Sequence, residues 1–133
     1  MSAGGITVYG GYARRMATEQ DLRAVALALP EAYEQASYGG TPSYRTKPRA
    51  FAHLREELNA VVVHVPSEED KHALVASNPR VFFTTPHYDG YAAVLVRLAE
   101  ISRDELAELV TDSWRLRAPA RAVRQWDAER SAE

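Results

Sequence analysis

The 133-residue sequence contains no cysteine. Thiol catalysis, thiolate metal sites and a disulfide framework are therefore excluded, because each of them needs a cysteine side chain. Long hydrophobic runs are also missing: apolar stretches such as 61–63 and 91–96 are far shorter than the ~20 residues of a membrane-spanning helix. The first sixteen residues lack the apolar segment of a secretory signal. The sequence thus predicts a cytoplasmic protein with no membrane partner.

An excess of charge of one sign is missing as well. Sixteen lysines and arginines stand against eighteen aspartates and glutamates, which gives a formal net charge of −2. The chain as a whole is therefore not marked as a binder of polyanions. Its 46% apolar and 26% charged residues are close to the averages of globular proteins, so wholesale disorder is excluded.

The common catalytic motifs are absent. There is no Gly-Lys-Ser/Thr phosphate loop, no Gly-x-Gly after a predicted strand, no Gly-x-Ser-x-Gly and no His-Glu-x-x-His. These absences argue against nucleotide hydrolysis, ordinary nucleophilic hydrolysis and zinc proteolysis. The sequence predicts a protein that is not an enzyme and that carries no cofactor.

Glycine is concentrated at the start of the chain. Residues 1–16 hold four of the seven glycines, which predicts a flexible leader, because ordering such a segment costs backbone entropy. An edge strand over residues 6–9 is the less favoured alternative. Residues 17–128 are predicted to form a single domain, and residues 129–133 a C-terminal tail.

Four helices are predicted from capping signals and apolar spacing. Thr18 is a suitable cap, and Glu19 and Asp21 place negative charge in the first turn. Ser102 and Glu105 have the spacing of a capping box before another helix. The predicted helical ranges are 18–29, 67–78, 102–117 and 120–128.

Six strands are predicted from a change to alternating hydrophobicity. Their ranges are 33–38, 43–46, 51–55, 60–65, 81–84 and 91–98. Turn residues recur about every ten residues, which is typical of antiparallel hairpins. Because the strands cluster instead of alternating singly with helices, the predicted class is α+β: an antiparallel sheet of about five to six strands with helices packed on one face.

Two of the four histidines were considered as metal ligands. A turn near Leu58 would bring His53 and His64 roughly opposite one another across a hairpin. Catalytic zinc usually has three protein ligands, however, and no carboxylate lies at a spacing that completes such a set. We therefore interpret both as solvated strand histidines and predict no metal site.

The loop over residues 84–91 is rich in reactive side chains. His87 and Asp89 are close enough in sequence for the histidine to act as a base toward a neighbouring threonine or tyrosine. The turn formers Pro86 and Gly90 favour the simpler interpretation of a turn. We predict no catalytic residue here.

Positive charge gathers locally despite the balanced total. Arg45, Lys47, Arg49 and Arg55 lie between residues 35 and 55, where there is no acidic residue. A cationic hairpin with nearby aromatics can contact phosphates, although lysine and arginine also protect exposed strands from edge pairing. The residues alone favour the protective role. A second basic stretch near the C-terminus contains Arg115, Arg117, Arg121 and Arg124.

The order and spacing of several short motifs over roughly residues 16–120 resemble a known family. These motifs are Ala-Leu-Pro-Glu at 28–31, Pro-Ser-Tyr-Arg at 42–45, Phe-Phe-Thr-Thr-Pro-His-Tyr-Asp-Gly-Tyr at 82–91, and the helix through Leu106, Leu109 and Trp114. The chain resembles the MmcQ/YjbR family of small bacterial proteins. This resemblance implies a compact α+β domain with a frataxin-like (CyaY-like) arrangement, and DNA binding through hairpins described as a double wing. Family members often carry glycine before lysine at the hairpin tip, where this chain has Pro48 and Arg49.

Two functions are predicted from these features. In the leading prediction the chain binds DNA, with Arg45, Lys47 and Arg49 contacting phosphates and Tyr44 supporting the strand. In the alternative, a pocket between the sheet and the helices binds or sequesters a small molecule. The residues predicted to line that pocket are Tyr38, His87, Tyr88, Asp89 and Tyr91.

Overall fold

The structure is a computed structural model that describes residues 6–9, 12–37, 39–47 and 49–132. A six-stranded antiparallel sheet in the order β3-β4-β5-β6-β8-β7 forms its centre. The strands are β3 (Tyr33–Ala36), β4 (Pro42–Arg45), β5 (Ala50–Arg55), β6 (Ala60–His64), β7 (Phe82–Phe83) and β8 (Ala93–Arg97). The helices are α1 (Glu19–Leu27), α2 (Glu68–Ser77), α3 (Arg103–Arg117) and α4 (Ala120–Ser131). The predicted α+β class is confirmed.

The helices begin where the sequence predicts. Thr18 and Asp21 form a capping box at the start of α1, and Ser102 and Glu105 form another at α3. The Ser67 side chain caps α2 by accepting a hydrogen bond from an amide of its first turn. These local bonds satisfy amides that have no partner within the helix, which fixes the first residue of each helix.

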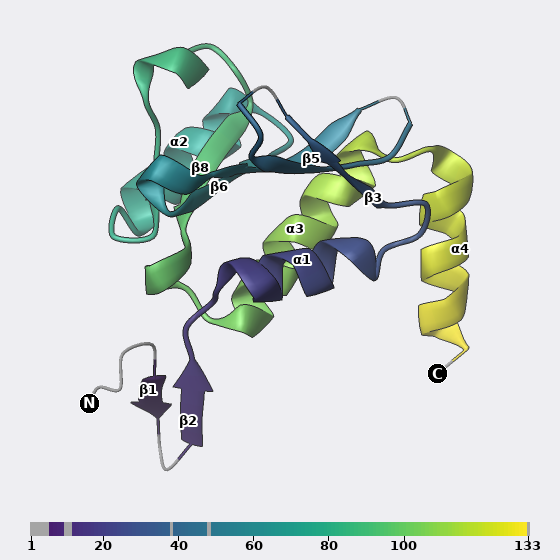
Figure 1. Cartoon of the computed structure of the whole chain (residues 1–133), viewed down its shortest axis with the longest axis horizontal. Helices are drawn as coiled ribbons and strands as arrows, with labels where there is room; N and C mark the ends of the chain where they lie inside the picture. Colours follow the sequence, from purple (N-terminus) through teal and green to yellow (C-terminus); the bar gives the residue numbers. More distant parts are fainter. Residues whose placement is uncertain (1–5, 10–11, 38, 48, 133) are drawn as a thin grey trace.

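One face of the sheet, called here the inner face, packs against α1 and α3 (Figure 1). Along each strand the side chains point alternately to this inner face and to the opposite face. Trp114 of α3 is fully buried under this face. Its indole N–H donates to the Pro30 carbonyl at 3.2 Å, and its ring meets Trp126 of α4 edge-on at 5.9 Å. The two tryptophans thus attach α4 to the core.

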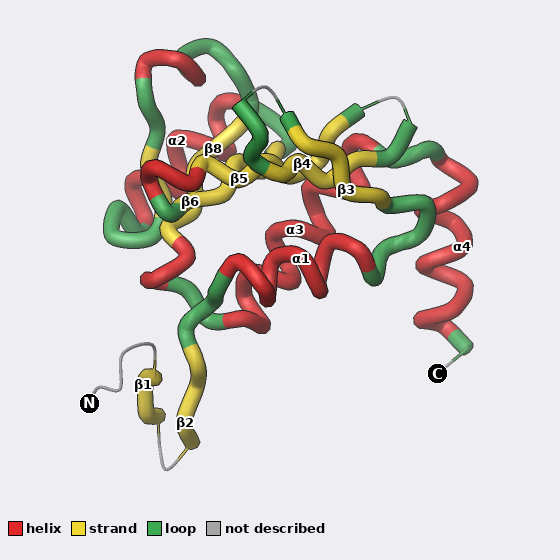
Figure 2. The backbone as a smooth tube through the Cα atoms, in the orientation of Figure 1, coloured by secondary structure: helices red, strands yellow, loops and turns green. Residues whose placement is uncertain are grey.

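The opposite face, called here the outer face, carries a smaller apolar cluster. Ala60, Val62, Ala93 and Leu95 are buried there, with Tyr88 packed against them. Tyr88 belongs to the 85–91 loop, which contains the short 3-10 turn η2 (Pro86–Tyr88). In Figure 2 this loop rises beside the sheet on the side away from α1 and α3.

The N-terminal segment forms strands where the sequence favoured a flexible leader. β1 (Ile6–Tyr9) and β2 (Tyr12–Arg15) pair antiparallel as a separate two-stranded sheet. The edge-strand alternative therefore describes residues 6–9 better, whereas flexibility of the segment stays a prediction. The segment joins the body through the Ala17 amide, which donates to the Ile101 carbonyl at 2.8 Å.

The C-terminal helix is longer than predicted. α4 continues to Ser131, so most of the predicted 129–133 tail is helical. Arg130 lies over the ring of Trp126 one turn earlier, with its guanidinium carbon 3.8 Å from the ring centre. This cation–π contact supports the last turn.

Across the described residues, no helix combines the length and the apolar character needed to cross a bilayer.

Candidate binding site on the outer face

We group four basic residues under the name cation cluster. Arg45 and Arg49 of the β4–β5 hairpin lie close enough to Arg117, at the end of α3, for their charges to act on it. Lys47 is included as the exposed lysine of the same hairpin. Arg49 Nη2 donates to the Arg117 carbonyl at 3.2 Å. In return, Arg117 Nε donates to the Ala50 carbonyl at 3.0 Å. These reciprocal bonds join the hairpin to the helix end and bring arginines distant in sequence together.

Positive charges lie close together in the cation cluster. The pKa of Arg117 is lowered by burial first and then by the charges of Arg49 and Arg45. Among the residues that the structure describes, no ion pair joins Lys47, Arg49 or Arg117 to a carboxylate. The carbonyls at the C-terminal end of α3 partly offset the repulsion, because a helix C-terminus favours positive charge.

Three other arginines of the predicted basic stretches are ion-paired. Arg115 contacts Asp127 at 2.6 Å, and Arg121 contacts Glu31 at 2.9 Å. Arg55 contacts Glu57 at 2.6 Å. The second basic stretch therefore does not act as a unit, since Arg117 joins the hairpin while Arg115 and Arg121 pair with carboxylates.

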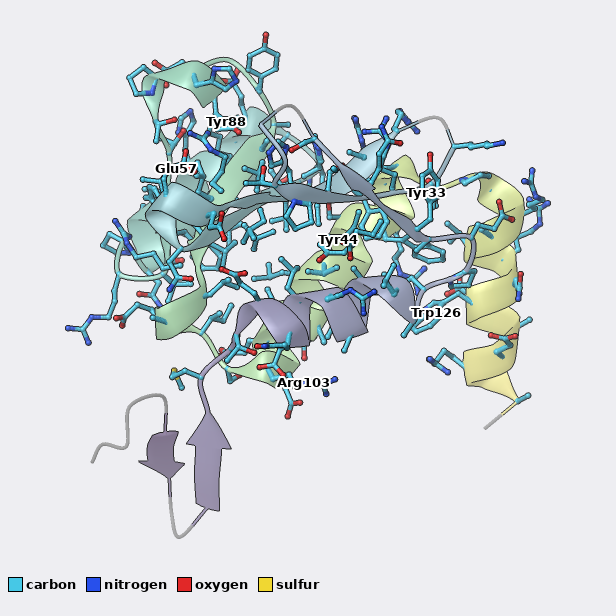
Figure 3. All side chains as sticks on the ribbon, viewed as in Figure 1. Tyr33, Tyr44, Glu57, Tyr88, Arg103 and Trp126 are labelled. Atoms are coloured by element: carbon cyan, nitrogen blue, oxygen red, sulfur yellow. The ribbon has the colours of Figure 1, made fainter. Side chains whose placement is uncertain are left out.

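Tyr44 does not belong to the site, which corrects its predicted place among the nucleic-acid-binding residues. It is only 2% exposed and packs in the core on the inner face, opposite in direction to its neighbour Arg45. Burial and then the charge of Glu34 raise the pKa of Tyr44 to about 12. Tyr44 supports β4 from the inner face, between the sheet and α1 (Figure 3), while Arg45 points to the outer face.

A cavity of about 270 Å³, called here the outer-face pocket, lies beside the cation cluster. It is lined by Ala50, Ala52, His53, Val62, His64, His87, Tyr88, Tyr91 and Ala93. The prediction of a pocket between sheet and helices is therefore wrong in position, because the cavity opens on the face opposite α1 and α3. His87, Tyr88 and Tyr91 meet there as predicted. Asp89 is exposed and is not part of the lining, and Tyr38 lies outside the described residues.

Two strand histidines also line the outer-face pocket instead of being solvated. His53 pairs with Val62, not with His64, because the turn η1 (Glu56–Leu58) sets the register of the hairpin. Burial first, and then the charges of Arg117 and Arg49, lower the pKa of His64 to about 4. The pKa of His53 is also lowered, mainly by burial. Both imidazoles are therefore neutral at pH 7.

Within the described part of the chain, no three histidine, aspartate or glutamate side chains are placed to hold one ion.

Ser113 of α3 binds the backbone of the two strands that line the pocket. Its hydroxyl donates to the Phe51 carbonyl at 2.5 Å and accepts from the His64 amide at 2.8 Å. The ladder between β5 and β6 ends at the neighbouring pair Ala52 and Val63, so the hydroxyl bridges the two strands where their direct pairing stops. This bridge satisfies two buried backbone groups and fixes the position of His64 at the strand end.

Lys71 holds the loop that forms the other side of the pocket. Its side chain is 1% exposed, and Nζ donates to the carbonyls of Tyr88 at 2.6 Å and Tyr91 at 3.0 Å. The Tyr88 hydroxyl accepts from Arg55 at 3.2 Å. Tyr88 is thus held at both its carbonyl and its hydroxyl, which fixes this wall of the pocket.

A second, larger cavity of about 630 Å³ lies between α2 and α3. Its lining is mainly apolar and includes the carboxylates of Asp70 and Asp112 and the guanidinium of Arg115, which is paired with Asp127. It contains no member of the cation cluster, so its chemistry does not suit an anionic partner. The outer face is the better candidate site.

Sequence reasoning missed several of these residues. Lys71 follows three acidic residues at a helix start, a pattern typical of a solvated face, and nothing in the sequence signals its burial. In the sequence, Arg117 belongs to a basic stretch far from the hairpin. His64 is predicted as a solvated strand residue, although its β-branched surroundings indicate a strand buried on both faces.

Comparisons with known proteins agree with this fold. The family model YjbR matches residues 27–116. Uncharacterized proteins of Mycobacterium tuberculosis and Mycobacterium bovis are 39% identical over 121 residues, which cover 81% of this chain and 94% of each relative. A crystal structure of Deinococcus radiodurans protein DR2400, with the domain DUF419, superposes with a TM-score of 0.64 at 23% identity, covering 74% of this chain and 77% of that chain. The chain belongs to the YjbR family.

Proposed function

We propose that this protein is a non-enzymatic DNA-binding domain whose cation cluster contacts phosphates. One observation carries the proposal: the bonds between Arg49 and Arg117 join the hairpin to the end of α3 and concentrate positive charge there. The frataxin-like arrangement and the double wing implied by the resemblance stay predictions.

The chemistry of the cluster suits phosphate groups. Guanidinium groups bind phosphate oxygens through paired hydrogen bonds, and release of counterions from the strand adds affinity. Lys47 and Arg49 are exposed at the hairpin, where a strand can reach them. A bound phosphate would also relieve the repulsion between Arg117 and its neighbours. The net charge of −2 does not oppose this, because many of the acidic residues lie on other surfaces or pair with other arginines.

The salt dependence of binding tests the proposal. With three or four phosphate contacts, log K for a labelled oligonucleotide against log salt is expected to fall with a slope of about −3. Fluorescence anisotropy over a salt series measures it. The control variants Arg115→Ala and Arg121→Ala should keep the slope, because their arginines are already paired with carboxylates. No complex at low salt, or a slope near zero, would refute the proposal.

Small-molecule binding is the second candidate, and the outer-face pocket is the observation that favours it. Ligand sites are usually concave and mostly apolar, with a few converging polar groups, as in this pocket. A thermal shift caused by an aromatic metabolite and abolished by His87→Ala, without any oligonucleotide binding, would favour this candidate over DNA.

A further inference from the structure

The outer-face pocket and the cation cluster are parts of one surface. Arg117 binds the carbonyl of Ala50, and Ala50 lines the pocket. His64 also lines the pocket and lies close enough to Arg117 and Arg49 for their charges to affect its titration. A ligand with an anionic group on the cluster can therefore extend directly into the pocket.

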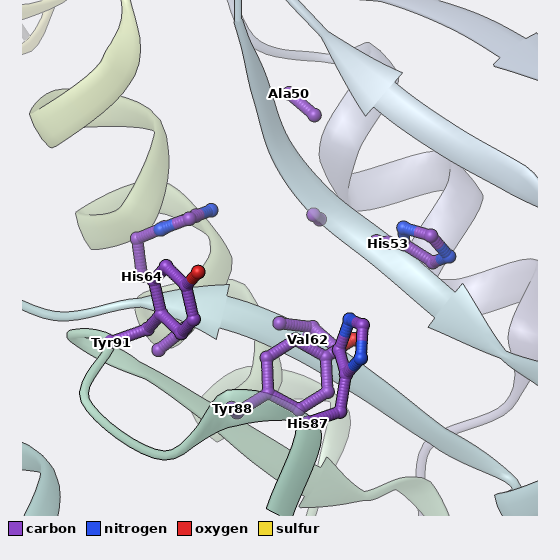
Figure 4. A pocket seen from close by; sticks show the side chains of 9 residues that line it. Ala50, His53, Val62, His64, His87, Tyr88 and Tyr91 are labelled. Atoms are coloured by element: carbon purple, nitrogen blue, oxygen red, sulfur yellow. The ribbon is translucent and has the colours of Figure 1, made fainter. Parts of the chain in front are cut away.

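The pocket has the form of a slot for a flat ring. Figure 4 shows His64 and Tyr91 on one side of the pocket, and His53, His87 and Tyr88 on the other, with Val62 between them. The rings of His87 and Tyr88 pack edge to face, with centres 4.8 Å apart. The volume of about 270 Å³ is just below the roughly 300 Å³ at which sites for drug-sized ligands begin, so one ring system fits.

The polar groups of the slot suit a neutral heterocycle. A neutral imidazole offers one donor and one acceptor, as the edge of a nucleobase also does. Tyr91 is 64% exposed, so its ring is available at the mouth of the pocket. Aromatic side chains of this kind commonly stack on the unpaired bases of single strands.

We infer that the outer-face pocket takes one unpaired nucleobase of the bound strand, while Arg49 and Arg117 hold the phosphates beside it. This inference rests on the proposed DNA binding. It adds a preference for DNA with unpaired bases, which phosphate contacts alone do not give. A base inside a duplex must first be unstacked and unpaired, at a cost in free energy. The protein therefore favours single strands and overhangs over blunt duplexes.

Three DNA ligands, of which the two with overhangs share the same backbone, test the inference by fluorescence anisotropy. They are a blunt duplex, the same duplex with a three-nucleotide overhang, and the same overhang built from abasic sugars. The overhang with bases is expected to bind about 10-fold more tightly than the abasic overhang, although both carry the same phosphates.

Two variants of the pocket provide the matched protein test. Tyr91→Ala removes an exposed ring, and Ala50→Leu fills the slot from its half-buried rim. Both should abolish the preference for overhang bases while leaving the affinity for the blunt duplex and its salt slope unchanged. Tyr33→Ala, which removes an exposed tyrosine of β3 that does not line the pocket, should preserve the preference.

The outcomes separate the inference from the proposed function. Salt-dependent binding that is equal for the two overhangs, or a preference that survives both pocket variants, overturns the inference and leaves DNA binding intact. A mononucleotide that binds as tightly as the overhang also overturns it, in favour of a small-molecule site. If none of the DNA ligands binds, the proposed function fails and the inference fails with it.

Discussion

Replacing Lys47 and Arg49 together by glutamate is expected to weaken DNA binding about 100-fold at 0.1 M salt. Each lost phosphate contact costs roughly 5-fold to 8-fold at this salt concentration, and the two new carboxylates add repulsion. Both side chains are exposed, so the fold should tolerate the change. Anisotropy titrations at several salt concentrations measure the loss, and the salt slope should become shallower by about 1.5.

The matched control for this charge reversal is Arg115→Glu with Arg121→Glu. It changes the net charge by the same amount, but it alters arginines that pair with Asp127 and Glu31 at the surface. Such exposed pairs contribute at most about 1 kcal/mol each, so this variant should also fold. Its affinity for DNA should fall only a few-fold. Equal losses in the two variants would mean that net charge, and not the cation cluster, governs binding.

Replacing Lys71 by alanine is expected to lower the free energy of unfolding by about 3–4 kcal/mol. The side chain is buried, and its nitrogen donates to the carbonyls of Tyr88 and Tyr91, which then lose their partner. The alanine also leaves a cavity in place of the lysine stem. Denaturant unfolding measures the loss, and hydrogen exchange in residues 85–91 should become faster.

A second variant separates these two contributions. Lys71→Met keeps most of the stem and removes only the donor, so it should lose less stability than alanine yet still release the 85–91 loop. Because this loop forms one wall of the outer-face pocket, the preference for overhang bases should decline in the methionine variant. A change in unfolding free energy below about 1 kcal/mol for Lys71→Ala would contradict the two hydrogen bonds.

Local chemistry explains why much of the fold could be predicted. The caps at Thr18 and Ser102 depend on neighbours three residues away, and the alternation along β4 to β6 depends on the next residue. Interactions of such short range are visible in a single sequence. These interactions are sufficient to predict where the helices start, where the hairpins lie and that the class is α+β.

Features that depend on distant partners could not be predicted in the same way. β8 pairs with β6 on one side and β7 on the other, so it is inserted between strands that precede it in the chain. Lys71 reaches carbonyls 17 and 20 residues away, and Arg49 reaches the carbonyl of Arg117 across 68 residues. The sequence therefore predicted the hairpin cations and the tyrosines of the loop as rival sites, whereas the fold places them on one surface.

The most direct test of the central claim, that the cation cluster and the outer-face pocket form one DNA-binding surface, is an amide chemical-shift map. A short single-stranded oligonucleotide would be titrated into the ¹⁵N-labelled protein at low salt. The account predicts that the largest shifts fall in the 45–53 hairpin, at His64, in the 87–91 loop and at the end of α3. Shifts centred on α1 or on the cavity between α2 and α3, or no shifts at all, would contradict it.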